Sequence, residues 1–268
     1  MRPILRVIPA PERIVPRKDW VDLLAILGLG PWLLVQGRRV RRETPVFPEP
    51  PGPRNGLAEP PLPQRSEAGV AEILRVLITG DSAAAGVGAS HQREALAGQL
   101  PPRLAQGLAR PIAWDLVART GLDIEGLCSL LAAHAGQQRY ELVMVSIGVN
   151  EVTAGTGWVA WQFRLTRLHH LLQNQLGARL VIYSGIPPMH RFPALPQPLR
   201  WFLGRRARRL DRALALWTQS ATGAQWVELP VLPDRAIAAD GFHPGLEAYS
   251  AWAEALVQAV LERRSAIA

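Results

Sequence analysis

From about residue 73 to the end of the chain, short apolar runs alternate repeatedly with helical stretches. Short apolar runs are typical of buried strands, and longer segments with apolar residues every three or four positions are typical of helices that cover a sheet. Strands are expected at Ile73–Thr79, Ile112–Ala118, Leu142–Ile147, Leu180–Ser184 and Gln225–Leu229. Helices are expected at Gln92–Leu108, Asp123–Ala135, Trp158–Leu176, Arg206–Ser220 and Leu246–Arg263. This order predicts an α/β domain in which a parallel sheet is covered by helices on both faces.

The first 42 residues combine basic side chains with one apolar run, Val21–Val35, which is followed by the arginine-rich segment Arg38–Arg42. At ~1.5 Å per residue a helix over this run spans about 22 Å, less than the ~30 Å hydrocarbon core of a bilayer. We expect either an interfacial membrane anchor, assisted by arginines on anionic headgroups, or a helix packed on the domain surface. A single membrane span is the third alternative. A membrane-associated and a cytoplasmic location both stay open.

Residues 43–70 are rich in proline and polar groups. Proline fixes φ and has no N–H to donate to a helix or a sheet, so this composition is typical of an extended linker without regular structure. The sequence therefore predicts three regions. They are a basic and apolar N-terminal segment at 1–42, a linker at 43–70 and a folded domain at 71–268.

Arginine supplies nearly all of the positive charge, since Lys18 is the only lysine and the formal net charge is +8. A basic surface attracts anionic lipid or nucleic acid. The arginines are scattered except at Arg38–Arg42 and Arg205–Arg209, and no nucleic-acid-binding motif accompanies them. We therefore expect no nucleic-acid partner. Cys128 is the only cysteine, which excludes a disulfide within the chain.

Polar residues that follow the strands mark the expected functional edge, because ligands of open parallel sheets bind beyond the carboxyl ends of the strands. The first strand leads into Ser82, at a junction where the amides of a following helix favour developing negative charge. The second strand ends near Gly121, whose backbone can approach a substrate closely. The third ends near Asn150, whose amide can donate to an oxyanion. Taken singly, each residue also fits a helix cap or a turn.

The segment before the last helix places a carboxylate and an imidazole three residues apart, at Asp240 and His243. Asp240 can then accept a hydrogen bond from one ring nitrogen of His243, which leaves the other nitrogen to take a proton from Ser82. A helix-capping aspartate beside a surface histidine is the alternative for this segment alone. The combination with Ser82 predicts a nucleophile, a general base and an orienting carboxylate.

Four short segments, which we call blocks one to four, contain Ser82, Gly121, Asn150, and Asp240 with His243. The order and spacing of these blocks resemble the SGNH hydrolases, also called GDSL-type esterases and lipases, over roughly Leu74–Leu261. The resemblance implies a flavodoxin-like, three-layer α/β/α fold with a parallel five-stranded sheet. It implies a catalytic triad of Ser82, Asp240 and His243, and an oxyanion hole formed by Ser82, Gly121 and Asn150. Two positions depart from the family's usual pattern, with Ala83 where many members have Leu and Glu151 where many have Asp. Neither change removes a catalytic group, and no metal or organic cofactor is implied.

The resemblance implies hydrolysis of a carboxylic ester through an acyl-enzyme at Ser82. After the fourth strand, residues 186–193 and 196–203 form a long proline-rich apolar connection of the kind that often serves as a lid or a binding wall. The residues expected to line an acyl site are Met189, Phe192, Trp201 and Phe202. A loop packed onto the core is the alternative. An apolar wall favours acyl esters or lysophospholipid-like substrates. The same triad also suits an O-acyltransferase, and a catalytically silent membrane-attached binding module remains a further hypothesis.

Overall fold

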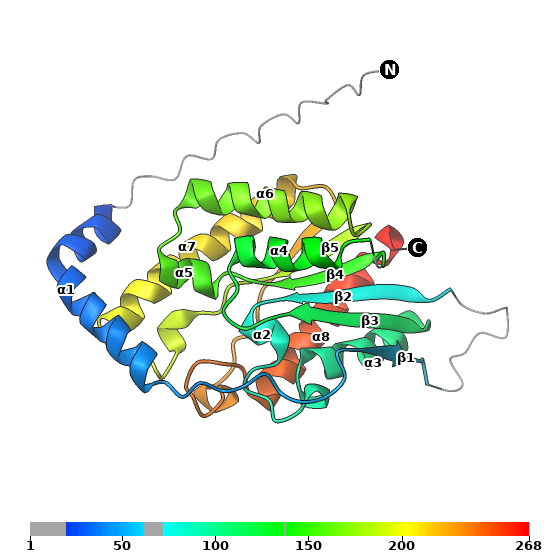
Figure 1. Cartoon of the computed structure of the whole chain (residues 1–268), viewed down its shortest axis with the longest axis horizontal. Helices are drawn as coiled ribbons and strands as arrows, with labels where there is room; N and C mark the ends of the chain where they lie inside the picture. Colours follow the sequence, from blue (N-terminus) through cyan, green and yellow to red (C-terminus); the bar gives the residue numbers. More distant parts are fainter. Residues whose placement is uncertain (1–19, 62–71, 137, 268) are drawn as a thin grey trace, which may run out of the picture.

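A computed structural model describes residues 20–61, 72–136 and 138–267 (Figure 1). Its centre is a six-stranded sheet in the order β1-β3-β2-β4-β5-β6. The strands are β1 (Asn55–Ala58), β2 (Leu74–Gly80), β3 (Ile112–Ala118), β4 (Leu142–Ser146), β5 (Leu180–Ser184) and β6 (Ala224–Val227). Strands β2 to β6 run parallel to one another, and β1 runs antiparallel to β3. The fold is therefore the expected α/β class, with the five expected parallel strands and one additional antiparallel strand at the edge.

The apolar runs of the sequence form strands because the middle of the sheet is covered on both faces. Every residue of β5 is buried, and so is all of β4 except its last residue. Such strands lack the alternation of apolar and polar residues that a half-exposed strand shows. The expected strands Ile112–Ala118 and Leu180–Ser184 have the observed bounds, and the other three differ by one or two residues at their ends.

Helices cover both faces of the sheet, with α4, α6 and α7 on one side and α3 and α8 on the other (Figure 1). The helices are α1 (Trp20–Glu43), α2 (Ser82–Ala85), α3 (Leu96–Leu108), α4 (Ile124–His134), α5 (Val149–Ala154), α6 (Trp158–Asn174), α7 (Leu199–Ser220) and α8 (Leu246–Glu262). Short 3-10 turns lie at Gln92–Glu94, Met189–Arg191, Asp234–Ala236 and Arg264–Ala266. Each helical layer packs its apolar face on the sheet, which gives two hydrophobic cores separated by the sheet.

Helix α7 begins seven residues before the expected start at Arg206, inside the segment that we expected to be a proline-rich connection. Leu199, Phe202 and Leu203 are buried and continue the apolar face of the helix at helical spacing. Pro198 stands directly before the helix, where a missing N–H removes no intrahelical hydrogen bond. The prolines therefore mark the start of the helix rather than a continuous loop.

Strand β1 lies in the segment at 43–70 that we expected to be a linker without regular structure. It pairs with β3 from Asn55 opposite Asp115 to Ala58 opposite Ile112. Most of β1 is exposed, so backbone hydrogen bonds rather than apolar burial hold it, and its sequence carries no apolar periodicity. The folded domain therefore includes residues before Ala71. Residues 62–71, which lead to β2, lie outside the described part of the chain.

Helix α1 packs against α7 but leaves most of its surface exposed. Asp22 forms ion pairs with Arg205 at 3.3 Å and with Arg209 at 3.1 Å, and the Gln36 side chain donates to the carbonyl of Gln197 at 2.6 Å. Its exposed apolar side chains are Trp20, Val21, Leu23, Leu24, Ile26, Leu27, Leu29, Trp32, Leu34 and Val35. The helix has 24 residues, longer than the apolar run, and its length and hydropathy also suit a membrane-crossing helix. Residues 1–19 of the N-terminal segment lie outside the described residues.

Candidate active site

Ser82 is the first residue of α2, directly after β2, so its hydroxyl lies at the carboxyl edge of the sheet. Asp81 caps this short helix, since its side chain accepts a hydrogen bond from the backbone N–H of Ala83 at 3.1 Å. The turn requires glycine at position 80, where φ is +149° and a Cβ would lie 1.9 Å from the carbonyl oxygen of Ser146. The close approach of β2 and β4 therefore fixes the turn that presents Ser82.

The three residues expected to form a triad are in contact. The Nδ1 atom of His243 lies 2.5 Å from Oδ2 of Asp240, and its Nε2 atom lies 2.9 Å from Oγ of Ser82. An ionised Asp240 accepts a hydrogen bond from the Nδ1–H group, which keeps the ring proton on Nδ1 and leaves the Nε2 lone pair free to accept from the Ser82 hydroxyl. The arrangement can remove a proton from the serine oxygen as that oxygen attacks an electrophile.

Asp240 is almost fully buried and accepts three hydrogen bonds. Besides the imidazole, the backbone N–H groups of Phe242 and His243 donate to its Oδ1 atom at 2.9 and 3.0 Å. Burial by itself raises the pKa of a carboxyl, but the hydrogen bonds from the His243 side chain and from these two backbone groups outweigh it and hold the pKa of Asp240 below its ordinary value. Asp240 is therefore an anion at neutral pH and fixes the orientation of the ring.

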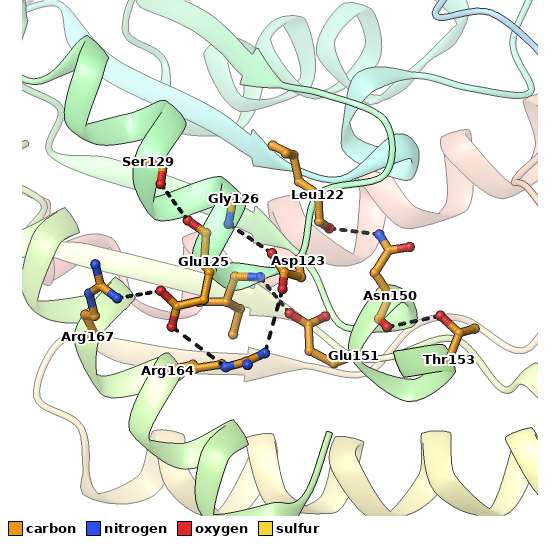
Figure 2. A network of polar contacts seen from close by, with 11 residues as sticks. Leu122, Asp123, Glu125, Gly126, Ser129, Asn150, Glu151, Thr153, Arg164 and Arg167 are labelled. Carbon is orange, nitrogen blue, oxygen red and sulfur yellow. Dashed lines mark hydrogen bonds and ion pairs between the residues drawn. The ribbon is translucent and has the colours of Figure 1, made fainter. Parts of the chain in front are cut away.

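Gly121 and Asn150, which we expected in an oxyanion hole, lie on adjacent segments at the same edge of the sheet. Figure 2 shows Asn150 pointing toward the segment that follows Gly121, where its Nδ2 atom donates to the carbonyl of Leu122 at 2.8 Å. An asparagine amide has two N–H groups, so a second donor remains for another acceptor. Gly121 has φ +82° and an exposed backbone. Neither Gly121 nor Asn150 is among the described residues that line the cavity beside Ser82.

A cavity of about 140 Å³ lies beside Ser82 and His243. Its walls come mainly from the segment after β5, which contributes Pro187, Pro188 and Phe192, and from the segment after β6. The residues contributed by this second segment are Leu229, Pro230, Leu232, Pro233, Asp234, Ala236 and Ile237. Phe192 packs edge-on against Phe242 with ring centroids 4.8 Å apart, so aromatic and proline side chains wall the space beside the nucleophile.

Of the four residues expected to line an acyl site, Phe192 lines this cavity and the other three do not. Met189 is completely buried in the core. Phe202 and Trp201 belong to α7, with the guanidinium of Arg206 over the Phe202 ring and that of Arg205 over the Trp201 ring. These three side chains therefore do not line the observed cavity, because residues 201 and 202 belong to a helix and Met189 packs in the core.

Two residues near the site had no signal in the sequence. The Oε1 atom of Glu49 accepts from the backbone N–H of Thr120 at 2.7 Å and from its hydroxyl at 3.0 Å. Arg54 pairs with Glu49 at 2.8 Å and also donates to the carbonyl of Ala118. The segment before β1 thus supports the turn that carries Gly121. Thr120 lies 71 residues after Glu49 in sequence and Ala118 lies 64 residues after Arg54, so no local pattern joins the two segments.

Two other reactive side chains, Cys128 and His169, lie inside the fold. Within residues 20–61, 72–136 and 138–267, no group of three or more His, Cys, Asp or Glu side chains is arranged to hold a metal ion. Cys128 is buried, and burial raises the pKa of its thiol, which disfavours the nucleophilic thiolate. His169 is held by the Tyr183 hydroxyl at 3.2 Å and the Thr222 carbonyl at 2.9 Å, inside the core.

A protein family and a curated relative match this chain in sequence. A family model described as the GDSL-like lipase/acylhydrolase family matches residues 78–251. The GDSL-like esterase Rv1075c of Mycobacterium tuberculosis is 27% identical over 198 residues, which cover 70% of this chain and 62% of that protein. The chain therefore matches less than two thirds of the length of this curated relative.

Solved structures share the fold. The lipase Lip_vut3 from a goat rumen metagenome has a TM-score of 0.56 at 15% identity, covering 72% of this chain and 97% of its own. The esterase EstA from Pseudoalteromonas sp. has a TM-score of 0.55 at 19% identity, covering 71% of this chain and 98% of its own. The family match spans all four blocks, from the turn at Ser82 to the segment of Asp240 and His243. By this match over most of its length, the chain belongs to the GDSL-like lipase/acylhydrolase family.

Proposed function

We propose that this protein is a serine esterase that hydrolyses carboxylic esters through an acyl-enzyme at Ser82. The observation that carries the proposal is the continuous contact from Asp240 through His243 to Ser82, with distances of 2.5 and 2.9 Å, beside a cavity. Membership of the family supports it, and so does the description of the relative from Mycobacterium tuberculosis as an esterase.

In the proposed mechanism, His243 takes the hydroxyl proton at Nε2 while Oγ of Ser82 bonds to the ester carbonyl carbon. Asp240 stabilises the imidazolium that forms. The imidazolium then gives its proton to the departing alcohol oxygen as the ester C–O bond breaks, which leaves the acyl group on Ser82. His243 next deprotonates a water molecule, whose oxygen attacks the acyl carbon. The imidazolium then returns this proton to Oγ of Ser82 as the bond between Oγ and the acyl carbon breaks, which releases the carboxylic acid and restores the free serine.

The oxyanion formed at each attack needs donors that are in place beforehand. We propose the backbone N–H groups of Ser82 and Gly121 and the remaining N–H of Asn150 for this role. Each such donor is worth about 3 kcal/mol in the transition state, or ~10²-fold in rate. The hydrogen bond from Asn150 to Leu122 supports the assignment, because it fixes the amide at the edge where the second and third blocks meet.

The cavity favours a small acyl group. Its volume of about 140 Å³ and its proline and phenylalanine walls suit a short apolar chain beside the nucleophile. The acyl chain of a lysophospholipid-like ester would have to extend beyond this space. We therefore propose short-chain acyl esters as the preferred substrates of the isolated enzyme.

A fluorophosphonate probe followed by a series of p-nitrophenyl esters of increasing chain length tests the proposal. We expect labelling and hydrolysis in the native protein, and neither in a folded Ser82→Ala variant, because this exchange at a turn removes little packing. Acyl transfer to an added alcohol in preference to water would identify an acyltransferase. A folded native protein that neither reacts with the probe nor hydrolyses any ester of the series would be a binding module instead.

We further propose that α1 attaches the protein to an anionic membrane surface while lying along it. The ion pairs from Asp22 to Arg205 and Arg209 support an interfacial position, since a helix that crossed the bilayer would break them or draw α7 into the lipid. Exposed leucines and tryptophans each contribute on the order of 1.5 to 3 kcal/mol when buried in lipid. Arginines at the end of α1 add about 1 kcal/mol each on anionic headgroups.

Flotation with vesicles that contain anionic phospholipid tests this attachment. Leu24 and Leu27 are among the most exposed apolar residues of α1, so their joint replacement by serine should abolish flotation without lowering the melting temperature. The matched control is Leu246→Ser on α8, an exposed leucine far from α1 in sequence. Undiminished flotation of the Leu24/Leu27 variant would refute the attachment, and so would a large loss of stability, which would indicate a packed helix.

A further inference from the structure

Glu151 is a fully buried carboxyl that the proposed chemistry does not use. It follows Asn150 on α5, and its side chain points away from solvent toward the start of α4 (Figure 2). Its Oε1 atom accepts a hydrogen bond of 2.6 Å from the backbone N–H of Ile124, the first residue of α4. Its Oε2 atom is buried and has no hydrogen-bond partner among the described residues. Such a group costs stability, so its presence calls for a reason beyond packing.

Two consecutive residues of α5 hold two points of one short segment. Asn150 binds the carbonyl of Leu122 at 2.8 Å, and Glu151 binds the N–H of Ile124 at 2.6 Å. The segment between Gly121 and Ile124 therefore cannot shift relative to α5 without breaking one of these hydrogen bonds. On its other side, Glu49 holds Thr120.

The remaining contacts at the start of α4 face a different direction. Asp123 caps the helix by accepting from the N–H of Gly126 at 2.9 Å, and Arg164 of α6 lies 3.7 Å from Asp123 and 3.7 Å from Glu125 (Figure 2). These contacts stabilise the helix end from its partly exposed side. Among the described hydrogen bonds, only those from Asn150 and Glu151 join the segment 121–124 to α5.

We propose that Glu151 is a positioning residue of the oxyanion hole, which keeps the segment that carries Gly121 at a fixed distance from Asn150. The inference rests on the proposed function, because the position of this segment matters for turnover only if Gly121 and Asn150 meet the oxyanion. A misplacement of about 1 Å can cost up to ~10²-fold in rate, so a loosened segment should lower kcat by about 10- to 100-fold. Ground-state binding depends less on the oxyanion donors, so KM should change by less than about threefold.

The substitutions Glu151→Met and Glu151→Gln separate positioning from packing. Methionine keeps the unbranched shape, removes the acceptor for the Ile124 N–H and also removes the unpartnered oxygen, so the fold should tolerate it. Glutamine keeps an acceptor oxygen at the same reach. We expect a large fall in kcat for Glu151→Met, a kcat within about threefold of the native value for Glu151→Gln, and native-like melting for both.

The matched control is Asp123→Ala, which removes another acceptor for a first-turn N–H of the same helix but leaves the links to Leu122 and Ile124. It should lower the melting temperature, since a helix cap is worth about 1 kcal/mol, and leave kcat within about threefold. An equal fall in kcat for this control would show that fraying of α4 in general is responsible, and would overturn the proposal.

A native kcat in Glu151→Met, an effect on KM alone, or an equal fall in Glu151→Gln would also overturn it. If Glu151→Met does not melt cooperatively, Glu151→Leu gives the same comparison, because leucine also lacks an acceptor for the Ile124 N–H. The native protein and Ser82→Ala, measured in parallel, show whether hydrolysis occurs at Ser82. Failure of the proposed function is therefore distinguishable from failure of this inference.

Discussion

Replacing Asp240 with asparagine is the sharpest test of the proposed triad, because the change leaves the shape of the side chain and most of its contacts in place. The Oδ1 atom, which accepts from the N–H groups of Phe242 and His243 at 2.9 and 3.0 Å, is still present in asparagine. Only the contact of 2.5 Å between Oδ2 and His243 Nδ1 is lost. The asparagine N–H then faces Nδ1, so the neutral ring carries its proton on Nε2 and can no longer accept the proton of Ser82.

The magnitude follows from this change of tautomer. We expect kcat/KM to fall by about 10⁴-fold, which at 1.36 kcal/mol for each tenfold step is about 5.4 kcal/mol. The loss of stability should be much smaller, about 1.5 to 3 kcal/mol for one hydrogen bond to a charged group. Because the native pKa of Asp240 lies below its ordinary value, this stabilisation is present above about pH 4 and disappears as the pH falls through the folded-state pKa.

The assay is hydrolysis of p-nitrophenyl acetate, with thermal melting of the same samples between pH 3 and pH 8. Asp234→Asn is the matched control, because this carboxyl also lines the cavity but is mostly exposed and bonded only loosely to Arg191 at 3.8 Å. It should keep kcat/KM within about threefold. An Asp240→Asn variant within tenfold of the native kcat/KM would refute the role assigned to Asp240, as would an equal loss in the control.

Three further outcomes are expected. Asn150→Ala should lower kcat by about 10²-fold with a smaller change in KM, since its amide meets charge that grows in the transition state; a change in KM alone would contradict this. Burial raises the pKa values of Asp81 and Glu151 to about 7, so stability should fall as the pH rises from about 4 to 7, and Glu151→Gln should show a weaker decline in melting temperature. If the melting temperature of Glu151→Gln declined with pH as steeply as that of the native protein, ionisation of the buried Glu151 would not be the cause. Phe192→Ala should extend the preferred acyl chain of p-nitrophenyl esters, and an unchanged optimum would exclude Phe192 as the wall.

Parallel strands were the part of the fold that the sequence predicted best. The bounds of Leu180–Ser184 were predicted without error because a strand buried on both faces appears as an uninterrupted apolar run. The edge strand Asn55–Ala58 has no such run, since only backbone pairing holds it. The start of α7 at Leu199 had a signal in its apolar spacing, which the prolines before it obscured.

The candidate site was predictable where its residues follow strands and not where it depends on packing. The parallel topology by itself places Ser82 and Asn150 at the same edge of the sheet, beyond the carboxyl ends of the strands. The short spacing in sequence between Asp240 and His243 allows their contact. The walls of the cavity come mainly from loops between helices and strands. Loops have no periodic sequence pattern from which their conformation could be predicted. The contact of Glu49 with Thr120 likewise depends on tertiary structure.

Strand β1 has a consequence for the solubility of the domain. It covers β3, whose N–H and C=O groups along that side would otherwise form an open edge. An open edge strand pairs readily with the edges of other molecules, which is a common route to aggregation. A fragment that begins at residue 71 would keep Ser82, Asp240 and His243 but would expose this edge. Strand β1 is then the edge strand itself, but it has only four residues, and very short edge strands pair poorly with other molecules. A shortened form that keeps residues 55–58 is therefore expected to aggregate less than one that begins at residue 71.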